Sequence, residues 1–300
     1  MSLEVSQFPL EEEYKKHSSI RPADIQLLRD WLKTQPHLPE EHITDLDLIL
    51  GYHCCDRSVE VTKQVLDFHY TFKTHSSLFK DQNCQTTLDY LKNILVVPLK
   101  QRAHDGGKVV FVRLYESDLK QFNLVECIRC ITAVLSLYQF EEGSWAGFHL
   151  LADLGGTSLA HVTRLDLATM QQASVFLQEG MLLKINHLHF INAPSWMDRL
   201  LLVIRPLLAS RLLASMHVHS SLGGLEEFMP AAGLLQDVGG QWKTFEEASA
   251  YIVQKAKDNR PFLEQEMKKR VDETRRPGKP RDLSDVFGGV EGSFKKLEID

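Results

Sequence analysis

Long apolar segments are absent from this 300-residue sequence, and positive charge is not in excess. No uninterrupted apolar run approaches the roughly 18 residues that a transmembrane helix needs, so we expect no membrane-spanning segment. Residues 1–10 contain no basic segment leading into an apolar run, and we therefore expect no secretory signal. The formal net charge is -6, which argues against a general nucleic-acid-binding protein, because such proteins present a basic face to phosphates.

Cysteine is scarce, and its pattern suggests no covalent or metal framework. The chain contains an odd set of five cysteines: Cys54, Cys55, Cys84, Cys127 and Cys130. Without an expected secretory signal, reduced thiols in the cytosol are predicted in place of disulfides. Cys127-x-x-Cys130 lies in a helical pattern without a second ligand pair, so we expect neither a zinc site nor a redox dithiol there.

The usual catalytic and nucleotide-binding motifs are also missing. A Gly-Gly pair at 155–156 follows an expected strand, but neither G-x-G-x-x-G nor G-x-x-x-x-G-K-[ST] is present. No G-x-S-x-G motif, H-E-x-x-H motif or paired-carboxylate site is present either. The sequence therefore predicts no enzyme activity and no cofactor.

Two histidine pairs form a minor alternative. His187-x-His189 and His217-x-His219 each place both imidazoles on one face of an expected strand. Adjacent strands would bring four imidazoles together, which is one way to build a metal site. We do not include a metal in the main expectation.

Three parts follow one another along the chain. Residues 1–92 have helical periodicity, for example around 25–32, 42–50 and 59–72, and are predicted to form a helical bundle. Residues 93–245 are predicted to form an α/β domain. Residues 246–300 are predicted to form a helix and a charged tail. In this tail, 275–280 is a linker by composition, and 286–300 is either docked in extended form or disordered.

Apolar strands alternate with long helical patterns in the central part. Such alternation requires crossover connections and indicates a mainly parallel sheet that is covered on both faces. The expected strands are 108–114, 147–153, 185–192 and 214–220, and the expected helices are 119–140, 162–182 and 195–208.

The segment 195–208 is apolar nearly all around its expected helix. Such a helix is either buried on both sides or in contact with lipid, and its length of about 21 Å is too short to cross a bilayer. A core helix is one interpretation, and a lid over a lipid cavity is the other. One face carries Trp196, Leu200, Val203, Ile204 and Leu207, and the other carries Met197, Leu201, Leu202 and Leu208.

Residues 185–219, INHLHFINAPSWMDRLLLVIRPLLASRLLASMHVH, resemble a stretch of the CRAL-TRIO lipid-binding family. In that family a strand leads through Asn-x-Pro into a mobile gate helix. The likeness extends over the helical part and the α/β part, and residues 275–300 resemble the ending of insect members. The resemblance implies a CRAL-TRIO α/β domain with a gate helix that covers one hydrophobic ligand.

The same resemblance implies a set of lipid-binding side chains. Two family positions that are serines facing a ligand hydroxyl correspond here to Cys130 and Val134, which favours a less polar or differently oriented cargo. Filling an ordinary core is the alternative role of these residues. The implied set is Cys127, Cys130, Val134, Phe148, Ala152, Phe176, Leu177, Leu183 and Leu188, together with Trp196, Leu200, Val203 and Leu207 of the gate.

Family members also bind a phosphoinositide head group through a basic patch beside the gate. Lys184 and Arg211 match two positions of that patch, while Asn186 and Ser215 stand at two others. The resemblance thus implies a partial phosphoinositide site at Lys184 and Arg211. Solvated surface charge is the alternative interpretation.

The expected function is that of an intracellular carrier. It would bind a tocopherol, retinoid, carotenoid or similar lipid as a monomer and exchange it during transient contact with membrane surfaces. A lipid- or phosphoinositide-responsive adaptor without transfer activity is the second hypothesis. An α/β enzyme with an unrecognised site is the third.

Overall fold

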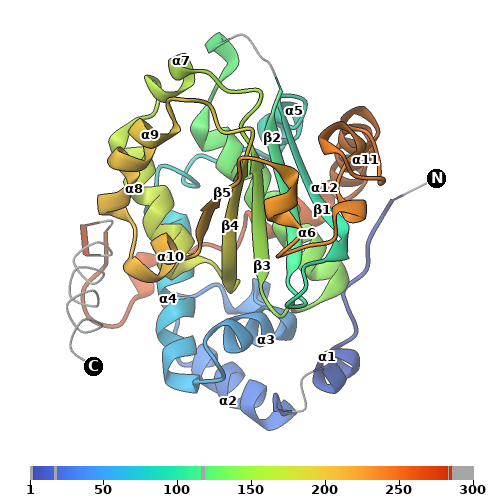
Figure 1. Ribbon diagram of the computed structural model, residues 1–300. Coiled ribbons are helices and arrows are strands. Elements are labelled where there is room, and N and C mark those ends of the chain that lie inside the picture. The colour runs from blue at the N-terminus through green and yellow to red at the C-terminus, as the bar shows by residue number, and fades with distance from the viewer. Residues whose placement is uncertain (1–2, 17–18, 116–118, 283, 286–300) are drawn as a thin grey trace.

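A central sheet with helices around it forms the middle of the molecule (Figure 1). The computed structural model describes residues 3–16, 19–115, 119–282 and 284–285. Helices α1 (Leu10–Lys16), α2 (Pro22–Lys33) and α3 (Asp45–Cys54) lie at one end of the sheet. Helices α11 (Phe245–Asp258) and α12 (Arg260–Glu266) lie beside β1 (Ile94–Arg102). A helical region followed by a mainly parallel α/β unit is therefore confirmed.

The amino-terminal helices begin where short polar side chains cap them. Thr44 accepts the Asp47 N–H at 3.2 Å, and Asn83 accepts the Thr86 N–H at 3.1 Å, so each side chain satisfies an otherwise free backbone donor. The elements of this region are α1 (Leu10–Lys16), α2 (Pro22–Lys33), the 3₁₀ turn η1 (Glu40–His42), α3 (Asp45–Cys54), α4 (Val59–His75) and α5 (Cys84–Tyr90).

The sheet has five strands in the order β1-β2-β3-β4-β5. Strands β2 to β5 are parallel to their neighbours, and β1 is antiparallel to β2. The expected strands 108–114 and 185–192 lie in the same sheet, as predicted. The strands are β1 (Ile94–Arg102), β2 (Lys108–Leu114), β3 (Phe148–Asp153), β4 (Ile185–Ile191) and β5 (Met216–Val218).

Strand β1 was not predicted, and its position explains why. It contains Pro98, which pairs with Val110 of β2. Proline cannot donate to a strand ladder and is tolerated mainly at a sheet edge, where β1 lies. A proline within an apolar run therefore obscured a real edge strand.

The two faces of the sheet carry different side chains. Strand register places His149, His189 and His217 on one face, which segment 219–245 covers; the ring of Phe228 lies 4.6 Å from that of His217. Helix α6 (Leu124–Glu142) packs on the opposite face, where the Lys108 ammonium lies 2.7 Å from a Glu142 carboxylate oxygen.

Two long predicted helices are interrupted in the structure. The pattern over 162–182 resolves into several elements because Asp166 caps a new helix through the Thr169 N–H. The pattern over 195–208 ends as a 3₁₀ turn because Pro206 lacks the N–H that a continued helix needs. The elements are η2 (Leu119–Gln121), α7 (Leu159–Val162), α8 (Leu167–Val175), the π-turn η3 (Phe176–Gly180), α9 (Met197–Ile204), the 3₁₀ turn η4 (Arg205–Leu207) and α10 (Ser210–Ala214).

The carboxyl-terminal part is docked onto the helical region as far as residue 282. The composition of 275–280 predicts a linker, but Arg276 is buried and donates to Asp67 of α4 at 2.8 Å. Arg281 donates to the same carboxylate at 2.7 Å. The predicted role of 286–300 lies outside the described residues. The last elements are the 3₁₀ turns η5 (Leu222–Leu225), η6 (Ala231–Gly233) and η7 (Gln236–Val238), α11 (Phe245–Asp258), α12 (Arg260–Glu266) and the 3₁₀ turn η8 (Glu273–Arg275).

We expect Glu273 to stabilise this docked segment in a pH-dependent way. Burial opposes its ionisation, but hydrogen bonds from Arg276 and the Arg281 N–H lower the pKa of Glu273 from 4.5 to about 2. Its contribution is therefore complete above about pH 4.5 and is lost as pH falls through about 2. We expect Glu273→Gln to cost about 1–2 kcal/mol at pH 7 and less at pH 3, after allowance for solvent screening. Urea unfolding of the wild type and the variant at pH 7 and pH 3 measures the loss in free energy of unfolding. An equal loss at both pH values would contradict the prediction.

Candidate functional site

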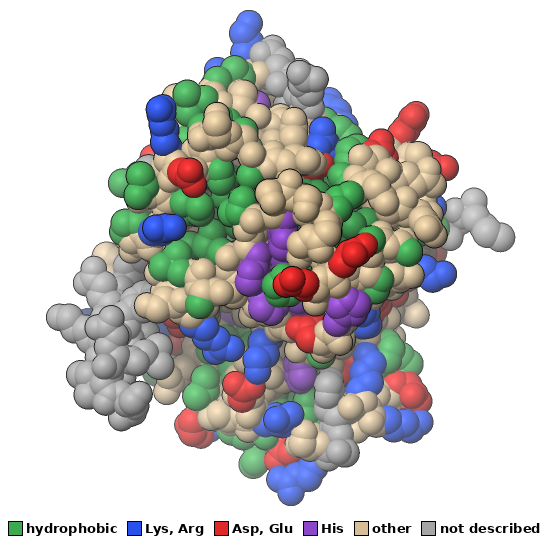
Figure 2. All heavy atoms as spheres, viewed as in Figure 1, with side chains coloured by type: hydrophobic (Ala, Val, Ile, Leu, Met, Phe, Trp, Pro, Cys, Tyr) green, Lys and Arg blue, Asp and Glu red, His purple; other side chains and the backbone are tan. Residues whose placement is uncertain are grey.

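Helix α9 lies at the surface and presents apolar side chains both inward and outward. The sequence pattern placed Met197 and Leu202 on one face, and this is wrong: Met197 is 4% exposed, whereas Leu202 is 68% exposed, because five residues correspond to well over one helical turn. Figure 2 shows hydrophobic side chains gathered over the region of α8, α9 and α10. The helix is thus not enclosed on both sides, which removes the simplest form of the core-helix interpretation.

The segment that follows α9 is held by a small set of hydrogen bonds to α8 and η3. The Ser174 hydroxyl donates to the Leu207 carbonyl, and the Gln178 side chain donates to the same oxygen at 3.1 Å. Gln178 also accepts the Ala209 N–H at 2.6 Å. Gln178 lies in the π-turn η3, and such turns often occur at functional positions.

The predicted lipid-binding residues are distributed around α6, η3, the sheet and the segment that contains α9 and η4. Their shared role as one cavity lining stays a prediction. The side chain of Val203 lies outside the described residues. Cys127, Cys130, Val134, Phe148, Phe176 and Leu188 are buried, and Ala152, Leu177, Leu183, Trp196, Leu200 and Leu207 are half-buried.

The two cysteines of α6 contact α5. The Cys130 thiol donates to the Thr87 carbonyl at 3.4 Å, and the Cys127 sulfur lies 3.7 Å from the Tyr90 hydroxyl. Burial raises the pKa of Cys127 to about 12 and also raises that of Cys130. Both groups are therefore neutral thiols near pH 7, unsuited to act as nucleophiles.

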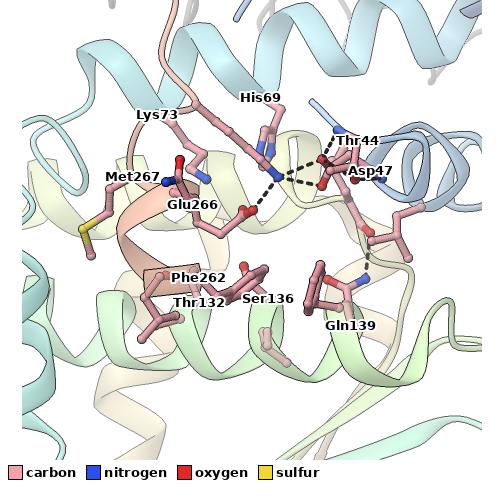
Figure 3. A pocket seen from close by; sticks show the side chains of 18 of the residues that line it. Thr44, Asp47, His69, Lys73, Thr132, Ser136, Gln139, Phe262, Glu266 and Met267 are labelled. Carbon is pink, nitrogen blue, oxygen red and sulfur yellow. Dashed lines mark hydrogen bonds and ion pairs between the residues drawn. The ribbon is translucent and has the colours of Figure 1, made fainter. Parts of the chain in front are cut away.

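A cavity of about 580 Å³ lies between the helical region and the α/β unit. Figure 3 shows Thr132, Ser136 and Gln139 of α6 on one side of it, with Asp47 and Lys73 on the other. Of the predicted lipid-binding set, the described wall of this cavity includes Phe176 and Leu183 only. This cavity is thus on the helical-region side of α6.

A charged cluster occupies one wall of that cavity. The Lys269 ammonium lies 2.8 Å from a carboxylate oxygen of Asp47 and also pairs with Glu266. Burial alone would raise the pKa of Asp47, but Lys269 and the Thr44 cap outweigh it and hold that pKa below its ordinary value. Burial lowers the pKa of Lys73 to about 8, and this ammonium has no ion pair among the described residues. Such a wall can hold water or a polar head group.

The sequence did not predict this wall, because its residues come from distant segments. Asp47 and Lys269 are 222 positions apart. One local signal was available: Thr44 and Asp47 form a capping box that fixes the Asp47 carboxylate at the start of α3. The partner of that carboxylate, Lys269, lies three residues beyond the end of α12 and meets Asp47 only in the folded chain.

The structure brings the predicted basic residues to the same side of the molecule, around Asp56. The Lys184 ammonium lies 2.6 Å from an Asp56 carboxylate oxygen. The hydrogen bond from Lys184, and the charges of Arg211 and Arg57, lower the pKa of Asp56. Arg211 is exposed and has no ion pair among the described residues. We call Arg57, Lys184 and Arg211 the basic patch.

Within the described part of the chain, no helix is long and apolar enough to span a bilayer.

Comparisons with known proteins identify both parts of the chain. The family described as "Pinta-like, UBA domain" matches residues 17–87, and the CRAL/TRIO domain matches residues 92–240. The alpha-tocopherol transfer protein-like protein of Homo sapiens is 24% identical over 232 residues, which cover 76% of this chain and 68% of that protein. Clavesin-2 of Homo sapiens is 23% identical over 230 residues, which cover 72% of this chain and 68% of that protein.

A solved structure, "Crystal structure of Sfh5", matches with a TM-score of 0.45 and 13% identity, covering 79% of this chain and 98% of that one. The CRAL/TRIO match spans all five strands and the segment from α9 to α10. The chain therefore belongs to the CRAL-TRIO family, a family of lipid-binding and lipid-transfer proteins.

Proposed function

We propose that this chain carries one hydrophobic small molecule between membranes. The ligand, a tocopherol, retinoid, carotenoid or similar lipid, occupies an internal cavity bounded by α6, the sheet and the gate, which comprises α9 to α10. The carrier works in the cytosol as a monomer and meets membranes transiently. This transfer makes and breaks no covalent bond. The protein supplies a cavity that fits the ligand and excludes water.

The exposed apolar surface of α9 is the observation that carries this proposal. Leu202 is 68% exposed, so the helix already has an apolar side turned to water. An apolar group on a surface helix gains free energy when it enters a membrane interface. The opposite side of the same helix includes half-buried Leu200 and buried Met197, which suit contact with a ligand or the cavity wall.

The sheet face near the gate supports the same proposal. On this face of β3 to β5, Leu150, Phe190 and Met216 are half-buried and Val218 is 49% exposed. Strands β3 and β4 are inner strands of the sheet, and inner strands of a covered sheet normally bury side chains such as Leu150 and Phe190 fully. A bound lipid would complete this burial, at about 0.8 kcal/mol for each methylene removed from water.

A vesicle assay tests the proposal. Donor vesicles carry a fluorescent tocopherol or retinoid and acceptor vesicles carry a quencher, and the purified chain is added in catalytic amount. We expect the transfer rate to rise in proportion to protein concentration. A chain that binds the lipid without accelerating its transfer would support the adaptor hypothesis instead.

The basic patch supplies the proposed contact with anionic lipid head groups. We expect Lys184→Ala combined with Arg211→Ala to weaken binding to phosphoinositide-containing vesicles by about thirtyfold at low ionic strength, since each basic residue contributes about 1 kcal/mol. Vesicle sedimentation measures the loss. Unchanged binding of the double variant at low salt would remove this site.

A change at Asp56 provides the matched comparison, because it removes a negative charge where the double variant removes two positive charges. Its carboxylate pairs with Lys184, so Asp56→Asn would free that ammonium for a phosphate group. We expect Asp56→Asn to bind the same vesicles about fivefold more tightly. If these residues did not lie against the vesicle surface, neither change would alter vesicle binding appreciably, because charges farther away than about 10 Å are largely screened at physiological ionic strength.

A further inference from the structure

Five imidazoles lie together on the sheet face opposite α6. Parallel register aligns His149 of β3 with His187 of β4, and His189 of β4 with His217 of β5. His219 follows β5, and its ring lies 5.2 Å from that of His189. Figure 2 shows these purple side chains near the centre of the front face, with acidic side chains next to them.

The imidazoles are connected to one another by ring-to-ring hydrogen bonds. His149 Nδ1 lies 3.1 Å from His189 Nε2, and His189 Nδ1 lies 3.0 Å from His219 Nε2. A second pair joins His187 Nδ1 to His217 Nε2 at 3.0 Å. Since a neutral imidazole has one donor and one acceptor, all rings can be satisfied while neutral.

One end of this cluster has the composition of a metal site. His149 Nε2 lies 3.0 Å from each carboxylate oxygen of Asp105, and His187 Nε2 has no hydrogen-bond partner among the described residues. One donor atom from each of Asp105, His149 and His187 lies within 4.8 Å of the others. We propose that these three residues bind a divalent transition-metal ion, with zinc as the cation to test first.

Only a small movement of the side chains would bring the three donor atoms to the spacing of a metal site. Tetrahedral coordination at about 2.0–2.2 Å places donor atoms roughly 3.3–3.6 Å apart. The Asp105 and His149 donors are already close to this spacing, and His187 must approach by about 1 Å. Asp105 is exposed and lies in the turn between β1 and β2, where Gly106 has a φ of +85°. This turn leaves the ion a route from solvent.

Each proposed ligand also has a partner that would orient it. With the metal on the Nε2 atoms, His149 Nδ1–H donates to His189 and His187 Nδ1–H donates to His217. Without a metal, a neutral His149 that donates from Nε2 to Asp105 would instead accept from His189. Metal-bound histidines usually have such a partner on the second nitrogen. The Asp105 carboxylate accepts from Asn186 at 2.6 Å and from the Gly107 N–H at 2.8 Å.

A strand irregularity explains the place of Asn186. Phe148 pairs with Ile185 and His149 pairs with His187, so Asn186 is the extra residue of a bulge in β4. Bulges redirect side chains and recur beside functional sites. Three protein ligands leave a fourth position for water or another small donor, and the ion would tie the β1–β2 turn to β3 and β4.

Calorimetry on the full chain tests the proposal. The protein is purified without a histidine tag, stripped with a chelator, and titrated with zinc chloride. We expect one equivalent to bind and the Tm to rise when zinc is present. We expect Asp105→Asn and His187→Gln each to weaken binding at least tenfold, and the zinc-free Tm of each variant reports whether its fold is intact.

His104→Gln is the matched control, because His104 is an exposed histidine next to Asp105 that is not among the proposed ligands. We expect this variant to bind zinc within twofold of the wild type. X-ray absorption of the zinc complex should show nitrogen and oxygen ligands only. The proposal is overturned if the wild type does not bind, if Asp105→Asn binds equally well, or if sulfur ligands are found.

Discussion

We expect the Lys269→Met protein to have a free energy of unfolding about 3–5 kcal/mol below that of the wild type. The Lys269 side chain is 5% exposed and pairs with both Asp47 and Glu266. Methionine occupies a similar volume but removes the ion-pair partner of both carboxylates, and the Lys73 ammonium, which also interacts with them, compensates only in part. Because both carboxylates lie on the wall of the 580 Å³ cavity, water entering it favours the lower end of that range.

Urea unfolding at pH 7 measures this change, and two further variants define its origin. Lys268→Met alters the neighbouring exposed lysine and should change the free energy of unfolding by less than about 0.5 kcal/mol. Glu266→Gln added to Lys269→Met removes one of the unpaired charges and should recover part of the loss. A Lys269→Met protein as stable as the wild type would mean that the cluster contributes no net free energy.

We expect Leu200→Asp to reduce lipid retention roughly tenfold to a hundredfold while the chain stays folded. Leu200 is half-buried on α9, and in the proposed carrier a carboxylate there would face either the ligand or the wall of its cavity. Burying a neutral polar group without a partner costs about 1–3 kcal/mol and burying an unpaired charge costs more, so we expect the gate to open to water or the carboxyl to stay protonated. Both outcomes lower the affinity for the lipid.

Leu202→Asp is the matched control on the same helix. Leu202 is 68% exposed, so its replacement should leave retention in water unchanged and slow exchange at membranes. A thermal melt and lipid quantification are carried out on both variants. If α9 were a fixed part of the core, Leu200→Asp would melt much earlier yet retain its lipid while folded.

The sequence predicted the main part of the sheet because its strands are short apolar runs. Strand β2 has the predicted bounds, Lys108–Leu114, and β4 differs from the prediction by one residue. The apolar patterns failed to predict an element or its end at two places where a proline interrupts the pattern. Pro98 obscured edge strand β1, and Pro206 ended helix α9 earlier than its apolar pattern suggested.

The histidine cluster was predicted only in part, because alternation within one strand does not say which residues of neighbouring strands lie side by side. Alternation within β4 and β5 was sufficient to place four imidazoles on strand faces. His149 and Asp105 were not included, because their position depends on how β3 pairs with β4 and how the β1–β2 turn folds back. A histidine two residues after Gly147, in an expected neighbouring strand, was the available signal.

Lipid content after contact with membranes tests the central claim most directly. The purified chain is incubated with vesicles of total cellular lipid, separated from them, extracted under denaturing conditions and analysed by mass spectrometry. We predict close to one molecule of a hydrophobic lipid per chain, enriched over its share in the vesicles, and much less with Leu200→Asp. A wild-type chain that leaves the vesicles without bound lipid, or with the lipid composition of the vesicles, would contradict the account.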